Sequence, residues 1–314
     1  MRRFVGGTHS SGRAALSALA MIMACAQCNS IAEPDLEPPT VYDGPSTVYY
    51  SAGGPPGTFE PRGIDALQLP DSTFSRIVPN SLSVVAPAVS RSGKWVATTM
   101  PGSNLWISRH DGQEGRQLSL GFLPSLNRVE WTPEETHLVV ARSGGDLELV
   151  DVANGSSRPL FGADIRPFQP SLSPDGRIVF VRGFGHAGLT DSIVLFVGNR
   201  DGTGIRQLTR AADGDATYPA WSPTGEWIAF RVFESGQPDG GIYLIGPDGS
   251  DRRRLFSGEY PTWSPDGKKL AFTRGVPTSG GLVPELYIGS LTGDTVRMTH
   301  DLASKYFPSW GRVP

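Results

Sequence analysis

Recurring arginines are the side chains in this sequence that are best suited to bind a ligand. They close successive hydrophobic segments at Arg142, Arg182, Arg231 and Arg274. Acidic residues precede several of the neighbouring segments, at Glu130, Asp215 and Glu259. If the fold brings these arginines together around one opening of the protein, their guanidinium groups could bind an anionic group or an acidic peptide segment. Alternatively, each arginine pairs with an acid of the next segment and only fixes the positions of the two segments at that opening. Such exposed ion pairs would add little stability.

Metal-binding and catalytic motifs are the other chemistry to consider. His186 and His300 could hold a metal ion together with Asp191 or Asp301, but no short ligand spacing supports such a site. The sequence also lacks a Gly-x-Ser-x-Gly elbow, an HExxH motif and a phosphate-binding glycine loop. We therefore predict a protein that is not an enzyme and has no metal and no cofactor. The alternative is a metal-dependent hydrolase, lactonase or lyase with its site at a channel mouth.

An internal repeat indicates the elements that position these side chains. Six segments align, with equivalent positions at Val89, Trp131, Leu172, Trp221, Trp263 and Trp310. The intervals are 42, 41, 49, 42 and 47 residues. Such intervals are typical of one four-stranded blade of a β-propeller, with the longer ones holding loop insertions. Recurrence of an aromatic residue at one position of the blade predicts that these side chains pack between neighbouring blades.

The turn inside each repeat supports the same interpretation. In Trp263-Ser264-Pro265-Asp266-Gly267, proline suits the first corner of a type I turn, and Asp and Gly suit the positions that follow. Apolar segments flank this turn and a second one at Pro247–Gly249, which gives strand, turn, strand, loop, strand, turn, strand. The 39 glycines and 27 prolines among 314 residues agree with an all-β chain rich in turns.

The two ends of the repeat region predict how the ring closes. The chain ends just after the segment at Trp310, which would supply only the first strand of a blade. Three further strands are predicted near the N-terminus, at Thr47–Ser51, Ile64–Leu69 and Phe74–Val78. Pairing them with the C-terminal strand would complete a shared blade and remove the exposed sheet edges. We therefore predict a six-bladed β-propeller over residues 47–314.

The repeat resembles that of the TolB family. Tyr260 to Gly267 (YPTWSPDG) and Tyr218 to Pro223 (YPAWSP) carry the likeness best, which extends over roughly residues 85–311. It implies a propeller that binds partners of the cell envelope without catalysis. TolB proteins have an α/β domain before the propeller, whereas the short stretch before the first clear repeat here contains no plausible one. A direct role in the Tol-Pal system is therefore not implied.

The N-terminus is predicted to be an export signal and an anchor. Residues 1–24 hold three arginines and then the apolar run Ala14–Ala24, which as a helix would rise only about 16 Å. The string Ile22-Met23-Ala24-Cys25 resembles the bacterial lipobox, which implies diacylation of the Cys25 thiol. An ordinary signal peptide cut near Ala26 is the alternative. Residues 25–46, rich in proline and acids, are predicted to form a tether.

Charge narrows the choice of partner. The formal net charge is −3, and removing the three arginines of residues 1–24 leaves −6, which argues against nucleic acid. We expect a monomeric, membrane-anchored binding scaffold of the cell envelope, at the periplasmic face of the outer membrane. Its partner would be an envelope protein or peptide, and it would contact the membrane only through the lipid anchor.

Loop lengths predict which face binds that partner. Loops between second and third strands, and between blades, gather on one face of a propeller, and here they include the longest ones. These are Gly183–Asp191, Arg210–Tyr218, Phe233–Gly240, Thr278–Val283 and His300–Lys305. The candidate binding residues on this face are Arg142, Arg182, Arg231, Arg274, His186, Asp191, Tyr218, Glu234, His300 and Tyr306.

Overall fold

The computed structural model describes residues 44–53, 63–125, 128–162, 165–184, 192–234 and 237–314. The predicted signal peptide, Cys25 and nearly all of the predicted tether lie outside these residues. Within the described part of the chain, no helix is both long and apolar enough to cross a membrane.

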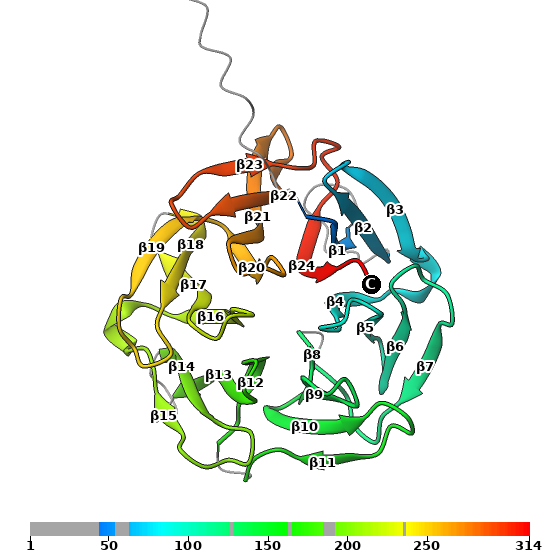
Figure 1. Ribbon diagram of the computed structural model, residues 1–314. Coiled ribbons are helices and arrows are strands. Elements are labelled where there is room, and N and C mark those ends of the chain that lie inside the picture. Colours follow the sequence, from blue (N-terminus) through cyan, green and yellow to red (C-terminus); the bar gives the residue numbers. More distant parts are fainter. Residues whose placement is uncertain (1–43, 54–62, 126–127, 163–164, 185–191, 235–236) are drawn as a thin grey trace, which may run out of the picture. The chain divides into compact units, whose positions relative to one another are not determined.

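Six four-stranded antiparallel sheets stand side by side around a central channel (Figure 1). This arrangement confirms the predicted all-β, six-bladed propeller. Blade 1 has the strand order β24(Lys305–Arg312), β1(Ser46–Ala52), β2(Ile64–Leu69) and β3(Thr73–Val78). Blade 2 comprises β4(Val85–Val89), β5(Trp95–Met100), β6(Asn104–Arg109) and β7(Arg116–Ser119), and blade 3 comprises β8(Glu130–Trp131), β9(His137–Arg142), β10(Asp146–Asp151) and β11(Ser157–Pro159).

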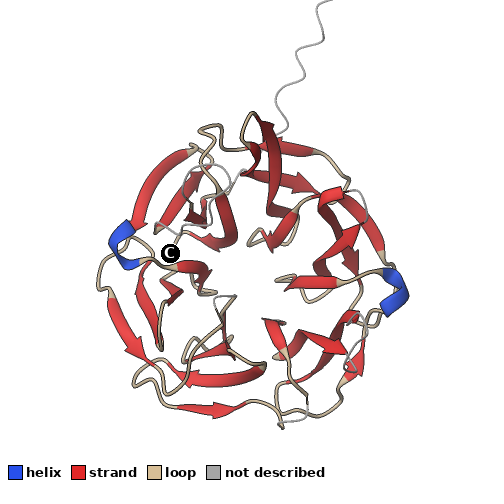
Figure 2. Cartoon of the chain, turned by 180° about the vertical axis from the view of Figure 1, so that it is seen from behind, coloured by secondary structure: helices blue, strands red, loops and turns tan. Residues whose placement is uncertain are grey.

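The other three blades follow the same order from the channel outward. Blade 4 comprises β12(Phe168–Leu172), β13(Arg177–Phe184), β14(Ser192–Asn199) and β15(Arg206–Gln207). Blade 5 comprises β16(Ala216–Trp221), β17(Ile228–Glu234), β18(Gln237–Ile245) and β19(Arg253–Ser257), and blade 6 comprises β20(Glu259–Trp263), β21(Lys269–Thr278), β22(Gly281–Ser290) and β23(Thr295–Arg297). Two short 3-10 helices, η2(Asn80–Leu82) and η3(Ala211–Asp213), lie at the outer edge of the ring (Figure 2).

Blade 1 closes the ring by pairing the two ends of the described chain. Strand β1 pairs antiparallel with β24, with Val48 opposite Trp310 and Ser46 opposite Arg312. The indole Nε1 of Trp310 donates a hydrogen bond to Ser46 Oγ at 2.9 Å. The predicted closure is confirmed, with β1 and β3 each beginning one residue earlier than the sequence indicated, at Ser46 and Thr73.

The Ser-Pro-Asp-Gly turn is held by its own side chains. Ser264 Oγ donates to Asp266 Oδ1 at 2.6 Å and accepts from the amide of Lys269 at 2.9 Å. The amide of Lys268 also donates to Asp266 Oδ1, at 3.1 Å. Gly267 has a φ of +73°, a conformation that glycine adopts without the steric cost of a side chain. These contacts explain why this residue order joins the first and second strands of blade 6.

The hydrophobic core lies between blades. Trp263 packs in one cluster with Ala220 and Ile242 of blade 5 and with Leu270 and Phe272 of its own blade. Trp131, Trp221, Trp263 and Trp310 are each between 5% and 7% exposed. The tryptophans therefore belong to the packing between blades, as the repeat predicts.

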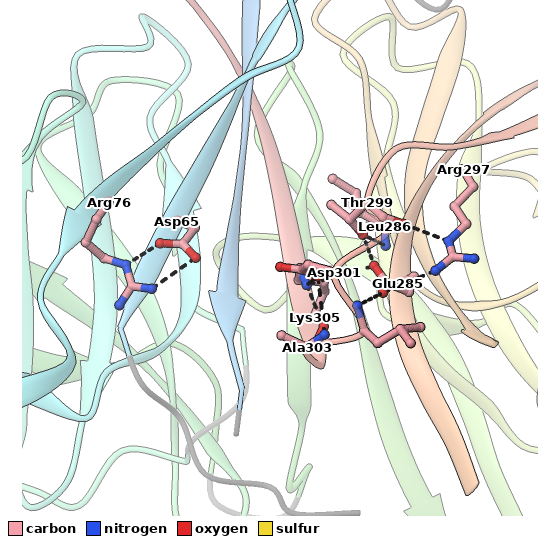
Figure 3. Close-up of polar contacts among 10 residues, drawn as sticks. Asp65, Arg76, Glu285, Leu286, Arg297, Thr299, Asp301, Ala303 and Lys305 are labelled. Carbon is pink, nitrogen blue, oxygen red and sulfur yellow. Dashed lines mark hydrogen bonds and ion pairs between the residues drawn. The ribbon is translucent and has the colours of Figure 1, made fainter. Parts of the chain in front are cut away.

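A cluster of charged groups is buried beside the closing strand (Figure 3). The Glu285 side chain on β22 is fully buried, and its carboxylate accepts hydrogen bonds from Thr299 Oγ1, the amide of Leu302 at 2.8 Å and Arg297 Nη2 at 3.3 Å. Lys305 Nζ, whose side chain is 2% exposed, lies 3.8 Å from Glu285 Oε2 and also bonds Asp301. Burial alone would raise the pKa of Asp301, but its hydrogen bond to Lys305 and that charge outweigh burial and lower the pKa.

Two of the predicted long loops form extended hairpins instead. Phe233 and Glu234 belong to β17 and Gln237–Gly240 to β18, while Thr278 ends β21 and Gly281 begins β22, with Thr278 opposite Gly281. Apolar pairing of Val276 with Val283 extends the ladder beyond the body of the blade. These hairpins mark one face of the propeller, called here the hairpin face. The Ser-Pro-Asp-Gly turns mark the opposite face, called here the turn face.

Candidate binding funnel

A cavity of about 420 Å³ opens at the centre of the turn face. Its wall is formed by equivalent residues at or near the end of each blade's innermost strand, at Val89, Trp131, Leu172, Trp221, Trp263 and Trp310. The prolines of the following turns, among them Pro174, Pro223 and Pro265, line its mouth. We call this cavity the funnel. Its volume is within the range of ligand-binding pockets.

Hydroxyl and carboxylate side chains fix the funnel wall by linking each blade to the next. Ser171 Oγ accepts from the amide of Trp221 at 3.0 Å, and Ser309 Oγ accepts from the amide of Val89 at 3.1 Å. Thr262 Oγ1 and Glu130 Oε1 accept from the equivalent amides of their neighbouring blades, each at 3.4 Å. These bonds satisfy buried donors and hold the six inner strands in register around the channel.

Where alanine occupies that position, the backbone makes the link. The indole Nε1 of Trp131 donates to the Ala88 carbonyl, and that of Trp263 donates to the Ala220 carbonyl, both at 2.9 Å. The tryptophan of one blade thus compensates for a hydroxyl missing from the previous blade. These links join every pair of neighbouring blades, so the funnel wall is a rigid scaffold.

A ring of six equivalent side chains forms the floor of the channel below the funnel. These are Ala86, Arg128, Gln169, Tyr218, Tyr260 and Phe307. The rings of Tyr218 and Tyr260 meet edge to face with centroids 4.5 Å apart, and Tyr260 and Phe307 are also 4.5 Å apart. Burial raises the pKa of both tyrosines. The aromatic half of the ring fills the channel at this level.

Backbone strain accompanies this ring. Ala86, Gln169, Tyr218, Tyr260 and Phe307 all have φ between 49° and 53°. Register shifts at the same places, for example between Thr217 and Ala220, show that the five inner strands carrying these residues each have a β-bulge. Left-handed conformations are unfavourable for residues with a side chain, so the packing around the channel must hold them in place. This strained ring is not among the features predicted above, although the Tyr-Pro pairs at two of the positions are a signal for it.

Arg128 is the charged member of the floor. Its Nη1 donates to the Pro219 carbonyl at 3.3 Å, and its Nε lies 3.2 Å from Glu130 Oε2. It lines both the funnel and a second, much smaller cavity beneath it, beside Ala86, Tyr218, Tyr260 and Phe307. The small side chain of Ala86 leaves space on this side of the ring, where Arg128 separates the two cavities.

The four recurring arginines lie away from the funnel, and their contacts differ. Arg231 pairs with Glu259 of the next blade and lies 3.7 Å from the ring centroid of Phe233. Arg142 pairs with Glu148 of its own blade, while Arg274 Nε donates to the Ser257 carbonyl at 3.0 Å. Arg182 lies 5.7 Å from the ring centroid of Phe196. Arg142 also lines a shallow cavity of about 350 Å³ on the hairpin face, together with Arg166.

Three of the other candidate residues are fully described by the structure. Tyr218 lies in the channel floor, Tyr306 lies 6.4 Å from Phe307 between ring centroids, and His300 is exposed. His186, Asp191 and the side chain of Glu234 lie outside the described residues. Among the residues that the structure describes, no group of three or more His, Cys, Asp or Glu side chains could hold a metal ion.

Comparison with known proteins supports the fold. No protein-family model matches the sequence. A protein assigned as TolB from Agrobacterium tumefaciens is similar in structure, with a TM-score of 0.62 and 16% identity, over 82% of this chain and 90% of that one. A chain of a nidogen/laminin complex gives a TM-score of 0.62 and 14% identity, over 85% of this chain and 98% of the other.

An enzyme of similar structure also shares the architecture. An oligogalacturonate lyase in complex with manganese gives a TM-score of 0.51 at 13% identity, over 82% of this chain and 74% of that chain. At these identities the likeness establishes the fold alone. Propellers of this kind occur in proteins that bind partners and in lyases, so function has to be argued from the site.

Proposed function

We propose that this protein is a non-catalytic binding scaffold of the bacterial cell envelope, and that its funnel holds a segment of a protein or peptide partner. The funnel carries this proposal. It is open to solvent on the turn face, and its floor is closed by Tyr218, Tyr260, Phe307 and Arg128. A rigid cavity with apolar side chains and a few placed polar groups is the usual form of a binding site.

The chemistry of the wall favours binding over catalysis. Most of the lining side chains are uncharged, and the hydroxyls of Thr262 and Ser309 in this lining already accept hydrogen bonds from neighbouring blades. The acid Glu130 is engaged by Arg128 and by the amide of Leu172.

The cellular context of the proposal comes from the N-terminal sequence. Export by residues 1–24 and acylation of Cys25 would anchor the propeller to a membrane through residues 25–45. Two or more acyl chains suffice for stable anchoring without a transmembrane helix. Metabolic labelling with palmitate should mark the full chain, and Cys25→Ser should abolish the label.

Site-specific photo-crosslinking in cells tests the funnel directly. A photoreactive residue replaces Thr224 at the funnel mouth, Ala153 in an outer turn of the same face, or Leu282 on the hairpin face; all three side chains are exposed. The funnel proposal expects one specific adduct from position 224 and none from position 153. An adduct from position 282 alone would place binding on the hairpin face, as the loop lengths predict, and would refute the funnel.

The enzymatic alternative has a separate test. A propeller hydrolase, lactonase or lyase of the metal-dependent kind should carry a stoichiometric divalent metal after purification from cells. Elemental analysis of the purified full chain distinguishes the two functions, because a binding scaffold of the proposed kind should contain none. A metal retained at one equivalent per chain would contradict the scaffold proposal.

A further inference from the structure

We propose that the funnel recognises carboxylate groups of an acidic peptide segment through Arg91 and Arg312. This inference rests on the proposed function and names the chemistry of the ligand at the same site. The two arginines line the funnel from adjacent blades: Arg312 ends β24 of blade 1, and Arg91 follows β4 of blade 2. Both side chains are exposed.

The turn that carries Arg91 is packed against the end of β24. A Cβ added to Gly93 would lie 2.2 Å from the Arg312 carbonyl oxygen, so only glycine fits this contact. Gly93 has a φ of +81°, and its amide donates to the Ser90 carbonyl at 2.9 Å. The two arginines therefore arise from backbone segments that are in direct contact and fixed relative to each other.

The charges of these two arginines are not neutralised within the described chain. Neither guanidinium group forms an ion pair or a hydrogen bond with any residue that the structure describes. Arg128, the third arginine of the lining, is different because Glu130 pairs with it. The remaining acid, Asp266, lies in blade 6, next to blade 1, and accepts from Ser264 and Lys268 within its own turn.

The funnel is thus basic in a chain that is acidic. The lining contains Arg91, Arg128 and Arg312 against Glu130 and Asp266, which gives +3 − 2 = +1, whereas the whole chain has a net charge of −3. Guanidinium groups form paired hydrogen bonds with planar carboxylates, and such charge-assisted bonds are about twice as strong as neutral ones. The two arginines without an ion-pair partner lie on the wall of blades 1 and 2, and an acid beside that wall, Glu135 of blade 3, accepts hydrogen bonds from the amide and hydroxyl of Ser92.

The opposite wall favours a peptide as the source of the carboxylate. Pro174 of blade 4 and Pro223 of blade 5 line the funnel on that side, together with Leu172 and Trp221. Proline and aromatic surfaces are suited to pack against proline and aliphatic side chains of an extended segment. A peptide that alternates acidic residues with proline or leucine would meet both walls at once.

A binding measurement with the full chain tests this chemistry. The probe is a fluorescein-labelled hexapeptide of alternating glutamate and proline, and its counterpart has glutamine in place of glutamate. We expect the glutamine peptide to bind at least tenfold more weakly than the glutamate peptide. The double substitution Arg91→Ala and Arg312→Ala should weaken binding of the glutamate peptide by a similar factor. Raising the salt concentration should weaken the binding of the glutamate peptide and leave the binding of the glutamine peptide almost unchanged.

Matched controls separate the site from general electrostatics. Arg109→Ala removes an exposed arginine that pairs with Glu114 on an outer strand, and it should leave peptide binding unchanged. Inorganic phosphate and vesicles of anionic lipid serve as competing probes. Displacement of the peptide by phosphate at equal or lower concentration would assign the site to phosphate groups, and binding to vesicles without binding to the peptide would assign it to a lipid headgroup. Either result overturns the proposal.

The outcome is also distinguishable from failure of the proposed function. If the adduct formed from position 224 in cells persists when Arg91 and Arg312 are both alanine, the funnel binds a partner but the arginines do not select it. In that case the scaffold function stands and the present inference is wrong. If position 224 yields no adduct with either version of the chain, the proposed function itself fails.

Discussion

Substitution of Glu285 should destabilise the whole ring, because this carboxylate joins blade 6 to the strand that closes it. Glu285→Ala removes the acceptor of the Leu302 amide at 2.8 Å, of Thr299 Oγ1 and of Arg297 Nη2. It also leaves Lys305, whose side chain is only 2% exposed, without one of its two acidic neighbours. Removing one partner from a buried ion pair costs about 3–5 kcal/mol.

The size of the effect can be measured by urea unfolding followed by tryptophan fluorescence. We expect Glu285→Ala to lower the free energy of unfolding by about 4 kcal/mol, and to lower Tm by roughly 10 °C at about 2–4 °C per kcal/mol for a large domain. Glu285→Gln keeps an acceptor and should lose less. If Glu285→Ala does not fold, the Gln variant provides the measurement.

A surface ion pair provides the control. Glu134 and Arg200 form two hydrogen bonds of 3.0 Å, but the side chain of Glu134 is 54% exposed. Exposed pairs contribute about 0–1 kcal/mol, so Glu134→Ala should be nearly neutral. A loss for Glu285→Ala no greater than that for Glu134→Ala would refute the argument that the buried cluster holds the closure.

Two further predictions follow from single contacts. Hydrogen bonding by Arg200 lowers the pKa of Glu134 from 4.5 to about 2. The stabilisation from this pair should therefore be complete above pH 4.5 and lost as the pH falls toward 2. NMR titration of the Glu134 carboxyl should show this low midpoint, and Arg200→Gln should move the midpoint back toward 4.5. Trp263→Phe leaves the Ala220 carbonyl without its indole donor, which should cost about 1–3 kcal/mol in urea unfolding, and a loss indistinguishable from zero would contradict this link between blades.

The architecture could be predicted from the sequence because its signals are local and repeated. The turn at Ser264–Gly267 needs proline, aspartate and glycine in that order, and the tryptophan before it recurs at intervals of one blade. Even the closing strands were found, since residues left over at both ends had to pair if no sheet edge was to stay exposed. The predicted starts of β1 and β3 were one residue late, because Ser46 and Thr73 add one more pair to each strand ladder without a change in the residue pattern.

The funnel could not be predicted in the same way. Loop length predicts binding on the hairpin face, which stays a prediction; two of those loops contain paired strand residues, for example Val276 opposite Val283 in one and Glu234 opposite Gln237 in the other. Arg91 and Arg312 are 221 residues apart in the sequence and meet only because the ends of the ring adjoin. Their proposed role depends on the pairing of distant strands. The recurrent Arg231, by contrast, forms an ion pair with Glu259 of the next blade, as the sequence pattern allows.

The position of Ser46 determines how the propeller carries mechanical load. Ser46 lies opposite Arg312 and bonds Trp310, so the polypeptide enters the ring at the rim of the funnel. It enters through β1, an interior strand flanked by β24 and β2. A pull on the N-terminal side directed out of the turn face runs along β1 and strains both of its hydrogen-bond ladders together, whereas a strand peeled from an edge loses its bonds one at a time. Tension between a partner held in the funnel and the preceding chain would therefore be borne by the blade that closes the ring.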